Sequence, residues 1–110
     1  MDATGGLWMK GALVGKSCGV FQSTGTQGGG QETIALTGII PFATHHGMVF
    51  VPIGYIEPKV FSYDEPHGAS PYGSGTYAGS DGSRQPSTLE KDVAVSHGKH
   101  FAKITSKLAA

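Results

Sequence analysis

Several residue types are scarce in this sequence of 110 residues, and each scarcity excludes a class of site. Asparagine does not occur, so N-linked glycosylation is excluded. Cys18 is the only cysteine, so no disulfide can form within the chain. Its apolar neighbours favour a buried structural thiol, and a reactive thiol is the alternative.

Charge is also scarce. Eight Lys and Arg residues balance eight Asp and Glu residues, and charged residues make up only 15% of the chain. This balance argues against nucleic acid or an anionic membrane as the main partner. No apolar run approaches the roughly 20 residues that cross a bilayer, and no secretory signal is recognisable at the start. We therefore expect a cytoplasmic protein, with peripheral membrane attachment as the alternative.

The hydrophobic pattern predicts alternating strands and helices. Residues 1–16 read as a loop or short helix, and residues 17–23 as a short buried strand. Residues 32–46 are helical, with Pro41 expected to kink or split the helix and Gly47 to end it. Residues 48–55 are apolar throughout, which is typical of a parallel strand covered on both faces.

The remainder combines a long loop with a final helix. Residues 56–86 contain no periodic segment. Residues 87–90 form a capping box that opens a helix with an apolar face, which runs nearly to the end of the chain. The order strand, helix, strand, loop, helix predicts one α/β domain over residues 1–110. Two strands cannot make a sheet covered on both faces, so we expect only part of a larger parallel-sheet domain.

Two glycine motifs give weak signals. Residues 11–17 resemble a phosphate-binding P-loop, but they have one residue too few between the glycines and precede a strand rather than a helix. Residues 73–78 fit a loose dinucleotide-binding pattern, but no strand or helix is predicted beside them. We interpret both as loop glycines.

The loop at residues 23–30 is more informative, because it joins the carboxyl end of a predicted parallel strand to a helix. Ligands bind at this place in open α/β sheets. Its glycines allow backbone N–H groups to converge on an anionic or carbonyl-rich planar ligand, and Ser23, Thr24 and Thr26 add hydroxyl groups. An ordinary flexible loop is the alternative.

Histidine and tryptophan provide further candidates. His45 and His46 are adjacent on a helix and point about 100° apart, so we expect no metal site there. One imidazole facing the glycine loop is the functional reading, and a histidine bonding the carbonyls of the helix end is the alternative. Trp8 is either a core residue or the wall of an aromatic pocket. His97 and His100 are expected to be surface or packing residues.

Six motifs occur in a fixed order along nearly the whole chain. They are Thr4-Gly5-Gly6-Leu7-Trp8, Ser23-Thr24-Gly25-Thr26-Gln27-Gly28-Gly29-Gly30-Gln31-Glu32-Thr33, His45-His46-Gly47-Met48, Val51-Pro52-Ile53-Gly54-Tyr55, Ser70-Pro71-Tyr72-Gly73 and Asp81-Gly82-Ser83-Arg84-Gln85-Pro86-Ser87. Together they resemble the flavodoxin-like NAD(P)H:quinone oxidoreductases of the WrbA type. The resemblance covers the C-terminal part of that family only, without the N-terminal half and its FMN phosphate loop.

The resemblance implies a flavodoxin-like fold, FMN as cofactor, NADH or NADPH as electron donor, and a homotetramer. It implies two-electron reduction of a quinone by a ping-pong hydride transfer through the flavin. It further implies that Trp8 walls the quinone and nicotinamide pocket and that His45 contacts the flavin. The implied FMN-binding residues are Ser23, Thr24, Gly25, Thr26, Gln27, Gly28, Gly29 and His45.

Two other functions stay open at this point. The chain is either an inactive flavodoxin-like fragment that assembles with full-length subunits, or an FMN-binding module without turnover. Without the phosphate loop, we expect the isolated chain to bind FMN weakly or not at all and to fold poorly. The strand around Val20 is expected to keep an open edge, and residues 56–85 are expected to reach a neighbouring subunit.

Overall fold

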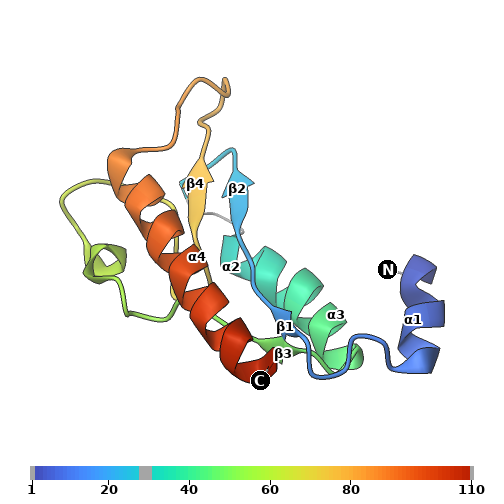
Figure 1. Cartoon of the computed structure of the whole chain (residues 1–110). Helices are drawn as coiled ribbons and strands as arrows, with labels where there is room; N and C mark the ends of the chain where they lie inside the picture. The colour runs from blue at the N-terminus through green and yellow to red at the C-terminus, as the bar shows by residue number, and fades with distance from the viewer. Residues whose placement is uncertain (1, 28–30, 110) are drawn as a thin grey trace.

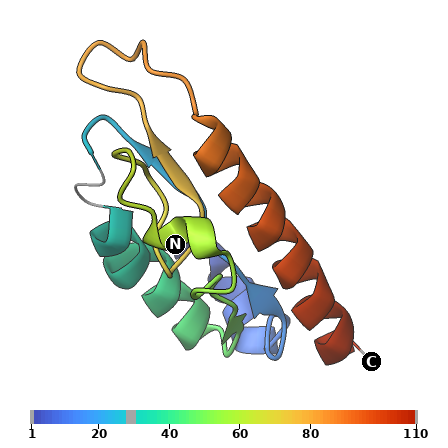
Figure 2. The same cartoon turned by 90° about the vertical axis from the view of Figure 1, so that its left-hand side faces the viewer.

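The computed structural model describes residues 2–27 and 31–109 and has the predicted α/β class, as part of a flavodoxin-like fold. Short parallel strands lie between two helical layers (Figure 1, Figure 2). One layer is α4 (Thr88–Ala109). The other is a helical segment in three consecutive parts, α2 (Gln31–Ile34), η2 (Ala35–Ile39) and α3 (Ile40–His45).

The predicted strand at residues 17–23 is two shorter strands, the one at residues 48–55 is a single shorter strand, and a fourth strand was not predicted. β1 (Ser17–Cys18) pairs in parallel with β3 (Val49–Phe50), and β2 (Gln22–Thr24) pairs in parallel with β4 (Gly75–Tyr77). One extended segment, residues 17–24, therefore pairs first with β3 and then with β4. The strand expected at residues 48–55 ends early, because Pro52 has no N–H to continue the ladder.

The interpretation of residues 56–86 as a stretch without regular structure is wrong. They contain η3 (Pro58–Phe61) and β4. β4 also corrects the reading of residues 73–78 as loop glycines alone. The sequence pattern did not predict this strand because it has only three residues and begins with a glycine, a residue that weakens strands.

Two glycines bring the long loop against the strands. A Cβ atom added to Gly73 would lie 1.9 Å from the backbone oxygen of Val20. One added to Gly68 would lie 2.6 Å from backbone atoms of Gly75. Real Cβ atoms do not approach other atoms this closely, so both positions require glycine for backbone packing.

The helical segment at residues 31–45 is interrupted near Pro41, as predicted. Its central turn, η2, is a π-helix that ends just before the proline, which lies in the first turn of α3. Proline is tolerated in a first turn because its missing N–H has no partner there. Gly47 then has a φ of 71°, and the N–H of Met48 donates to the Ala43 oxygen at 2.9 Å, so the predicted helix stop is confirmed.

The capping box of α4 is confirmed in both of its hydrogen bonds. The Glu90 N–H donates to Ser87 Oγ at 3.1 Å, and the Ser87 N–H donates to Glu90 Oε1 at 2.8 Å. The predicted apolar face is only partly covered, because Val93 is fully buried whereas Leu108 is 46% exposed. Among the described residues, no helix is both long and apolar enough to cross a membrane.

The first residues form what we call the N-terminal arm, residues 2–15, which extends away from the strands (Figure 1). It contains η1 (Asp2–Thr4) and α1 (Gly5–Lys10), and neither has a buried residue. Gly11 ends α1 with a φ of 62°, and the Gly15 N–H donates to the Gly47 oxygen at 2.9 Å. The motif at residues 11–17 is therefore a turn that leads into β1, not a P-loop.

Candidate functional site

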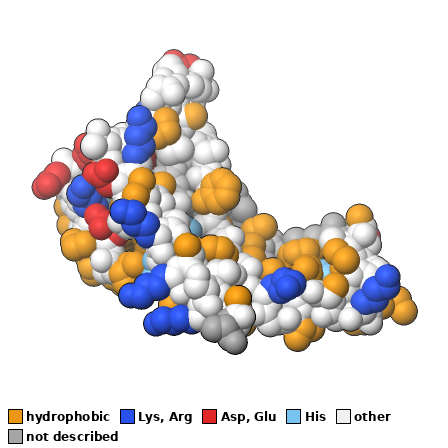
Figure 3. Space-filling view, in the orientation of Figure 1, with side chains coloured by type: hydrophobic (Ala, Val, Ile, Leu, Met, Phe, Trp, Pro, Cys, Tyr) orange, Lys and Arg blue, Asp and Glu red, His pale blue; other side chains and the backbone are white. Residues whose placement is uncertain are grey.

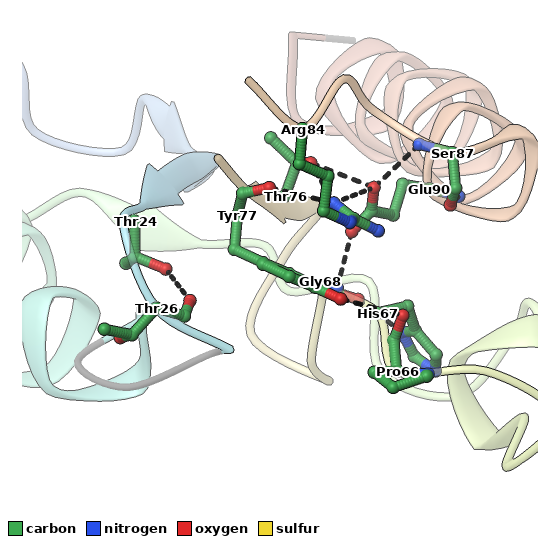
Figure 4. Close-up of polar contacts among 10 residues, drawn as sticks. All are labelled: Thr24, Thr26, Pro66, His67, Gly68, Thr76, Tyr77, Arg84, Ser87 and Glu90. Atoms are coloured by element: carbon green, nitrogen blue, oxygen red, sulfur yellow. Dashed lines mark hydrogen bonds and ion pairs between the residues drawn. The ribbon is translucent and has the colours of Figure 1, made fainter. Parts of the chain in front are cut away.

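The glycine loop begins where β2 ends, at the carboxyl edge that β2 and β4 share. The Ala78 N–H donates to the Thr24 oxygen at 2.8 Å, and Thr24 Oγ1 donates to the Thr26 oxygen at 2.7 Å (Figure 4). Ser23, Gly25, Thr26 and Gln27 are exposed, and Thr24 is half-buried. Gly28 and Gly29 lie outside the described residues.

Space is open beside this loop. A Cβ atom added to Gly25 would meet no heavy atom within 4 Å. Thr24 pairs in register with Tyr77, so an aromatic ring lies next to the loop on β4. The Arg84 guanidinium carbon lies 3.6 Å from the centre of that ring, a cation–π contact. The described part of the loop thus leaves room for a planar group beside polar atoms.

The carboxylate of Glu90 holds the long loop in place. It accepts hydrogen bonds from the Gly68 N–H at 2.6 Å, Thr76 Oγ1 at 2.9 Å, Arg84 Nη1 at 3.0 Å and the Ser87 N–H (Figure 4). We call these five residues the Glu90 network. Burial alone raises the pKa of Glu90, but the hydrogen bonds outweigh it, so the pKa is lowered and the carboxylate stays charged.

A second concave region lies between α1 and α3, and we call it the α1–α3 cavity. It has a volume of about 420 Å³ and is lined by Trp8 and His45, two of the predicted site residues. Trp8 is 59% exposed, so it is not a core residue. The position of Trp8 fits the interpretation of its ring as the wall of an aromatic pocket.

His46 was not singled out as a site residue, but it is the more constrained of the two adjacent histidines. It is 6% exposed, its Nε2 lies 3.0 Å from Thr4 Oγ1, and its ring centre lies 4.6 Å from that of Phe42. Its buried Nδ1 has no hydrogen-bond partner within the described ranges. Only the three-residue spacing from the apolar Ala43 could have indicated that His46 faces inward.

The glycine loop and the α1–α3 cavity are separate. The loop precedes α2, whereas His45 is the last residue of α3, about 20 Å away at the rise of a helix. Neither Ser23 nor any other described loop residue lines the cavity. Within the described residues of one chain, the structure does not bring an imidazole against the glycine loop, and the expected contact stays a prediction. The helix predicted over residues 32–46 lies between the two places, and the structure confirms a helical segment there.

The remaining candidates are structural. Cys18 is half-buried, and burial raises the pKa of its thiol, which favours the unreactive protonated form. His97 is 6% exposed and packs inside, while His100 is half-buried. In residues 2–27 and 31–109, no three His, Cys, Asp or Glu side chains lie close enough together to hold a metal ion.

The chain is similar to curated proteins over nearly its whole length. It is 55% identical over 108 residues to the NAD(P)H quinone oxidoreductase PST3 of Candida albicans, which covers 96% of this chain and 54% of that protein. It is 56% identical over 108 residues to the quinone-oxidoreductase QR2 of Triphysaria versicolor, with 97% and 52% covered. The NAD(P)H quinone oxidoreductase PST2 of Candida albicans is 52% identical over 102 residues, with 93% and 50% covered.

This chain thus spans about half the length of the curated relatives it matches. No protein-family model matches it. The identity is high enough that the residues here descend from the same ancestral sequence as part of those oxidoreductases.

Proposed function

We propose that this chain is part of a WrbA-type, FMN-dependent NAD(P)H:quinone oxidoreductase. The observation that carries the proposal is the identity of 52–56% to relatives with quinone oxidoreductase names. The glycine loop supports it, since it lies at the carboxyl edge of a parallel strand pair, where open α/β sheets bind ligands. In this reading NADH or NADPH is the electron donor and a quinone is the acceptor.

The described residues of the glycine loop support a place for the ring portion of FMN. Gly25 leaves open space beside the loop, and the hydroxyl of Ser23 is exposed next to it. The motif at residues 11–17 is a turn, so we assign no residue of this chain to the FMN phosphate. When bound, the cofactor would supply the two-electron exchange between NAD(P)H and the quinone.

The residues of this chain would bind and orient the reactants. N–H and hydroxyl groups of the loop would stabilise negative charge on the ring of the reduced cofactor. Trp8 would cover the planar substrate from one side, and His45 would donate a hydrogen bond next to it. The buried Nδ1 of His46 points to a further polar contact in the same cavity.

The separation of the loop from the α1–α3 cavity bears on assembly. Within one chain, Trp8 and His45 do not line the same space as the loop. A homo-oligomer, such as the homotetramer that the family resemblance implies, would bring the cavity of one chain to the loop of another. The proposed site is then shared between subunits, and its exclusion of water depends on assembly.

The test is a flavin titration of the 110-residue chain, followed by flavin fluorescence. Because this chain offers residues for the ring but none that we assign to the phosphate, FMN and riboflavin should bind with similar, weak affinity. Gly25→Val fills the open space and should lower that affinity at least tenfold. The matched control is Gly98→Val, an exposed helical glycine of α4 where an added Cβ also meets nothing within 4 Å.

Three outcomes would count against the proposal. One is that neither flavin binds at millimolar concentration even when the chain is assembled with the unmatched half of a relative. Another is that Gly25→Val binds as well as the unchanged chain. The third concerns turnover. If flavin binds but no NAD(P)H-dependent quinone reduction is found in the chain assembled with the unmatched half of a relative, a flavin-binding module without turnover is the better description.

A further inference from the structure

The two walls of the α1–α3 cavity come from segments far apart in the sequence. Gly5 and Trp8 lie on α1, whereas Pro41 and His45 lie on α3. The separation of the walls limits the thickness of a ligand, because an aromatic ring needs about 3.5 Å to the atoms on each of its faces. Whatever joins α1 to α3 therefore decides which ligands the cavity accepts.

Burial of apolar side chains does not hold the arm in place. Neither η1 nor α1 has a buried residue. Figure 3 shows hydrophobic side chains exposed on the part of this face that the arm forms, on the right of the view. A segment with few buried apolar contacts opens easily, so the position of the arm depends strongly on its individual polar contacts.

Two hydrogen bonds join the arm to the end of α3. The Gly15 N–H donates to the Gly47 oxygen at 2.9 Å, close to the start of β1. At the other end of the arm, Thr4 Oγ1 lies 3.0 Å from His46 Nε2. Thr4 and His46 both line the α1–α3 cavity, one from each side. We call this second contact the tether.

Thr4 makes this distant hydrogen bond in place of a local one. It occupies the N-cap position of α1, where a threonine hydroxyl usually accepts from an N–H of the first helical turn. No such side-chain bond forms, and the hydroxyl instead meets His46, 42 residues away in the sequence. Trp8 follows Thr4 by four residues, so it lies on the same side of the helix one turn later. The tether therefore fixes the turn that carries the Trp8 ring.

The surroundings of His46 favour a positioning role over a packing role. The side chain is buried, with its ring centre 4.6 Å from that of Phe42. Its Nδ1 has no hydrogen-bond partner in the part of the chain that the structure describes. An apolar ring would fill the same place without the cost of an unpaired buried nitrogen. What a histidine adds here is Nε2, the atom that bonds Thr4.

We propose that His46 is a positioning residue for the substrate wall. Through Thr4 it holds α1 against α3, and it thereby keeps the Trp8 ring over the cavity at a fixed distance from His45. A fixed gap favours flat rings over bulkier ligands. The statement about flat substrates rests on the proposed function, whereas the tether and its effect on Trp8 do not.

The experiment measures the mobility of Trp8 in the 110-residue chain, without flavin or quinone. Trp8 is the only tryptophan, so the decay of its fluorescence anisotropy reports movement of the arm. His46→Phe keeps a ring beside Phe42 but removes Nε2, and it should raise the detached fraction of the arm about fivefold. Thr4→Val should do the same. The double variant should add little to either change, because both remove the same bond.

Two conservative variants separate the hydrogen bond from the shape of the side chain. Thr4→Ser keeps the hydroxyl, and His46→Gln offers a side-chain amide that can donate or accept. Both should stay within about twofold of the unchanged chain in the detached fraction. The matched control is Thr44→Val on α3, where the lost hydroxyl donates only within its helix, to the Ile40 oxygen at 2.8 Å. This control should leave the mobility of Trp8 unchanged.

Binding of naphthoquinone, followed by quenching of Trp8 emission, gives the second measurement. His46→Phe should weaken the apparent affinity about fivefold, and His46→Gln should restore most of it. If Trp8 becomes mobile in the tether variants but the unchanged chain binds no quinone, the tether holds and the proposed function fails. If His46→Phe and Thr4→Val lower the urea midpoint while the anisotropy of Trp8 stays unchanged, His46 is a packing residue and the proposal is overturned.

Discussion

The Glu90 network and the N-terminal arm are organised in opposite ways. In the network, one carboxylate with a side chain only 2% exposed ties the long loop, β4 and the start of α4 together. In the arm, Leu7, Trp8 and Met9 are between 45% and 81% exposed, and no residue is buried. The polar groups of the network bond one another. The arm instead exposes apolar side chains, which a ligand or another chain would cover. The network that ties the fold together and the proposed site residue Trp8 thus lie in different parts of the structure.

Removing the centre of the network should have the largest effect on stability. We expect Glu90→Ala to lower the free energy of unfolding by about 3–5 kcal/mol, because Arg84 and two N–H groups lose a buried charged acceptor. Urea unfolding followed by circular dichroism measures the change. The control is Asp92→Asn, which breaks only the exposed ion pair with Lys59 and should change little. Equal effects of the two changes would contradict the assignment of the network.

The backbone contact at Gly73 should be nearly as sensitive. Gly73→Ala places a Cβ atom against the Val20 oxygen, so the two chain segments must separate, at a cost of about 3 kcal/mol. Gly25→Ala is the matched control, since its Cβ meets nothing within 4 Å and should cost less than about 0.5 kcal/mol. Similar urea midpoints for the two variants would show that the loop does not pack as described.

Stability should also depend on pH through His97. Burial, and then the charge of His100, lowers the pKa of His97 in the folded chain. The unfolded chain therefore binds a proton first, so this contribution is complete above about pH 6.5 and is lost as the pH falls below that value. Urea midpoints measured between pH 5 and 7.5 should fall towards the acid end. His97→Asn should flatten that slope, and an unchanged slope would assign the effect to another group.

The smallest effect on folding is expected in the arm. Trp8→Ala should change the free energy of unfolding by no more than about 0.5 kcal/mol, because the ring is mostly exposed. Because Trp8 is the only tryptophan, a quinone bound beside it should quench the tryptophan emission of the unchanged chain. His45→Ala keeps the tryptophan fluorophore and should weaken the quenching of its emission by the quinone. A large loss of stability in Trp8→Ala would show that the arm is part of the folded core. The contrast between the arm and the Glu90 network would then disappear.

Local signals in the sequence predicted the elements that depend on neighbours in the chain. The capping box at residues 87–90, the interruption near Pro41 and the stop at Gly47 are all formed as expected. Each is determined within about five residues, where propensity and side-chain bonding decide the structure.

Structural features that depend on residues far apart in the sequence were not predicted. β4 has three residues and becomes a strand only because the distant β2 pairs with it. The site was predicted as a set of residues but not as an arrangement, because sequence motifs do not show which side chains line the same cavity. The burial of His46 and the orphaned Nε2 of His97 likewise follow from tertiary packing alone.

Residues 17–24 pair with two separate strands rather than with one. This affects how the chain folds and where it tolerates insertions and deletions. Partners in β1 and β3 lie about thirty residues apart in the chain, and partners in β2 and β4 more than fifty. The longer closure adds less than about 1 kcal/mol of entropy, so the insertion between β3 and β4 is thermodynamically inexpensive. Contacts at greater sequence separation form later, so β1 and β3 should pair before β2 and β4. The exposed turn around Tyr63 is therefore a place where an insertion or deletion should leave both strand pairs intact.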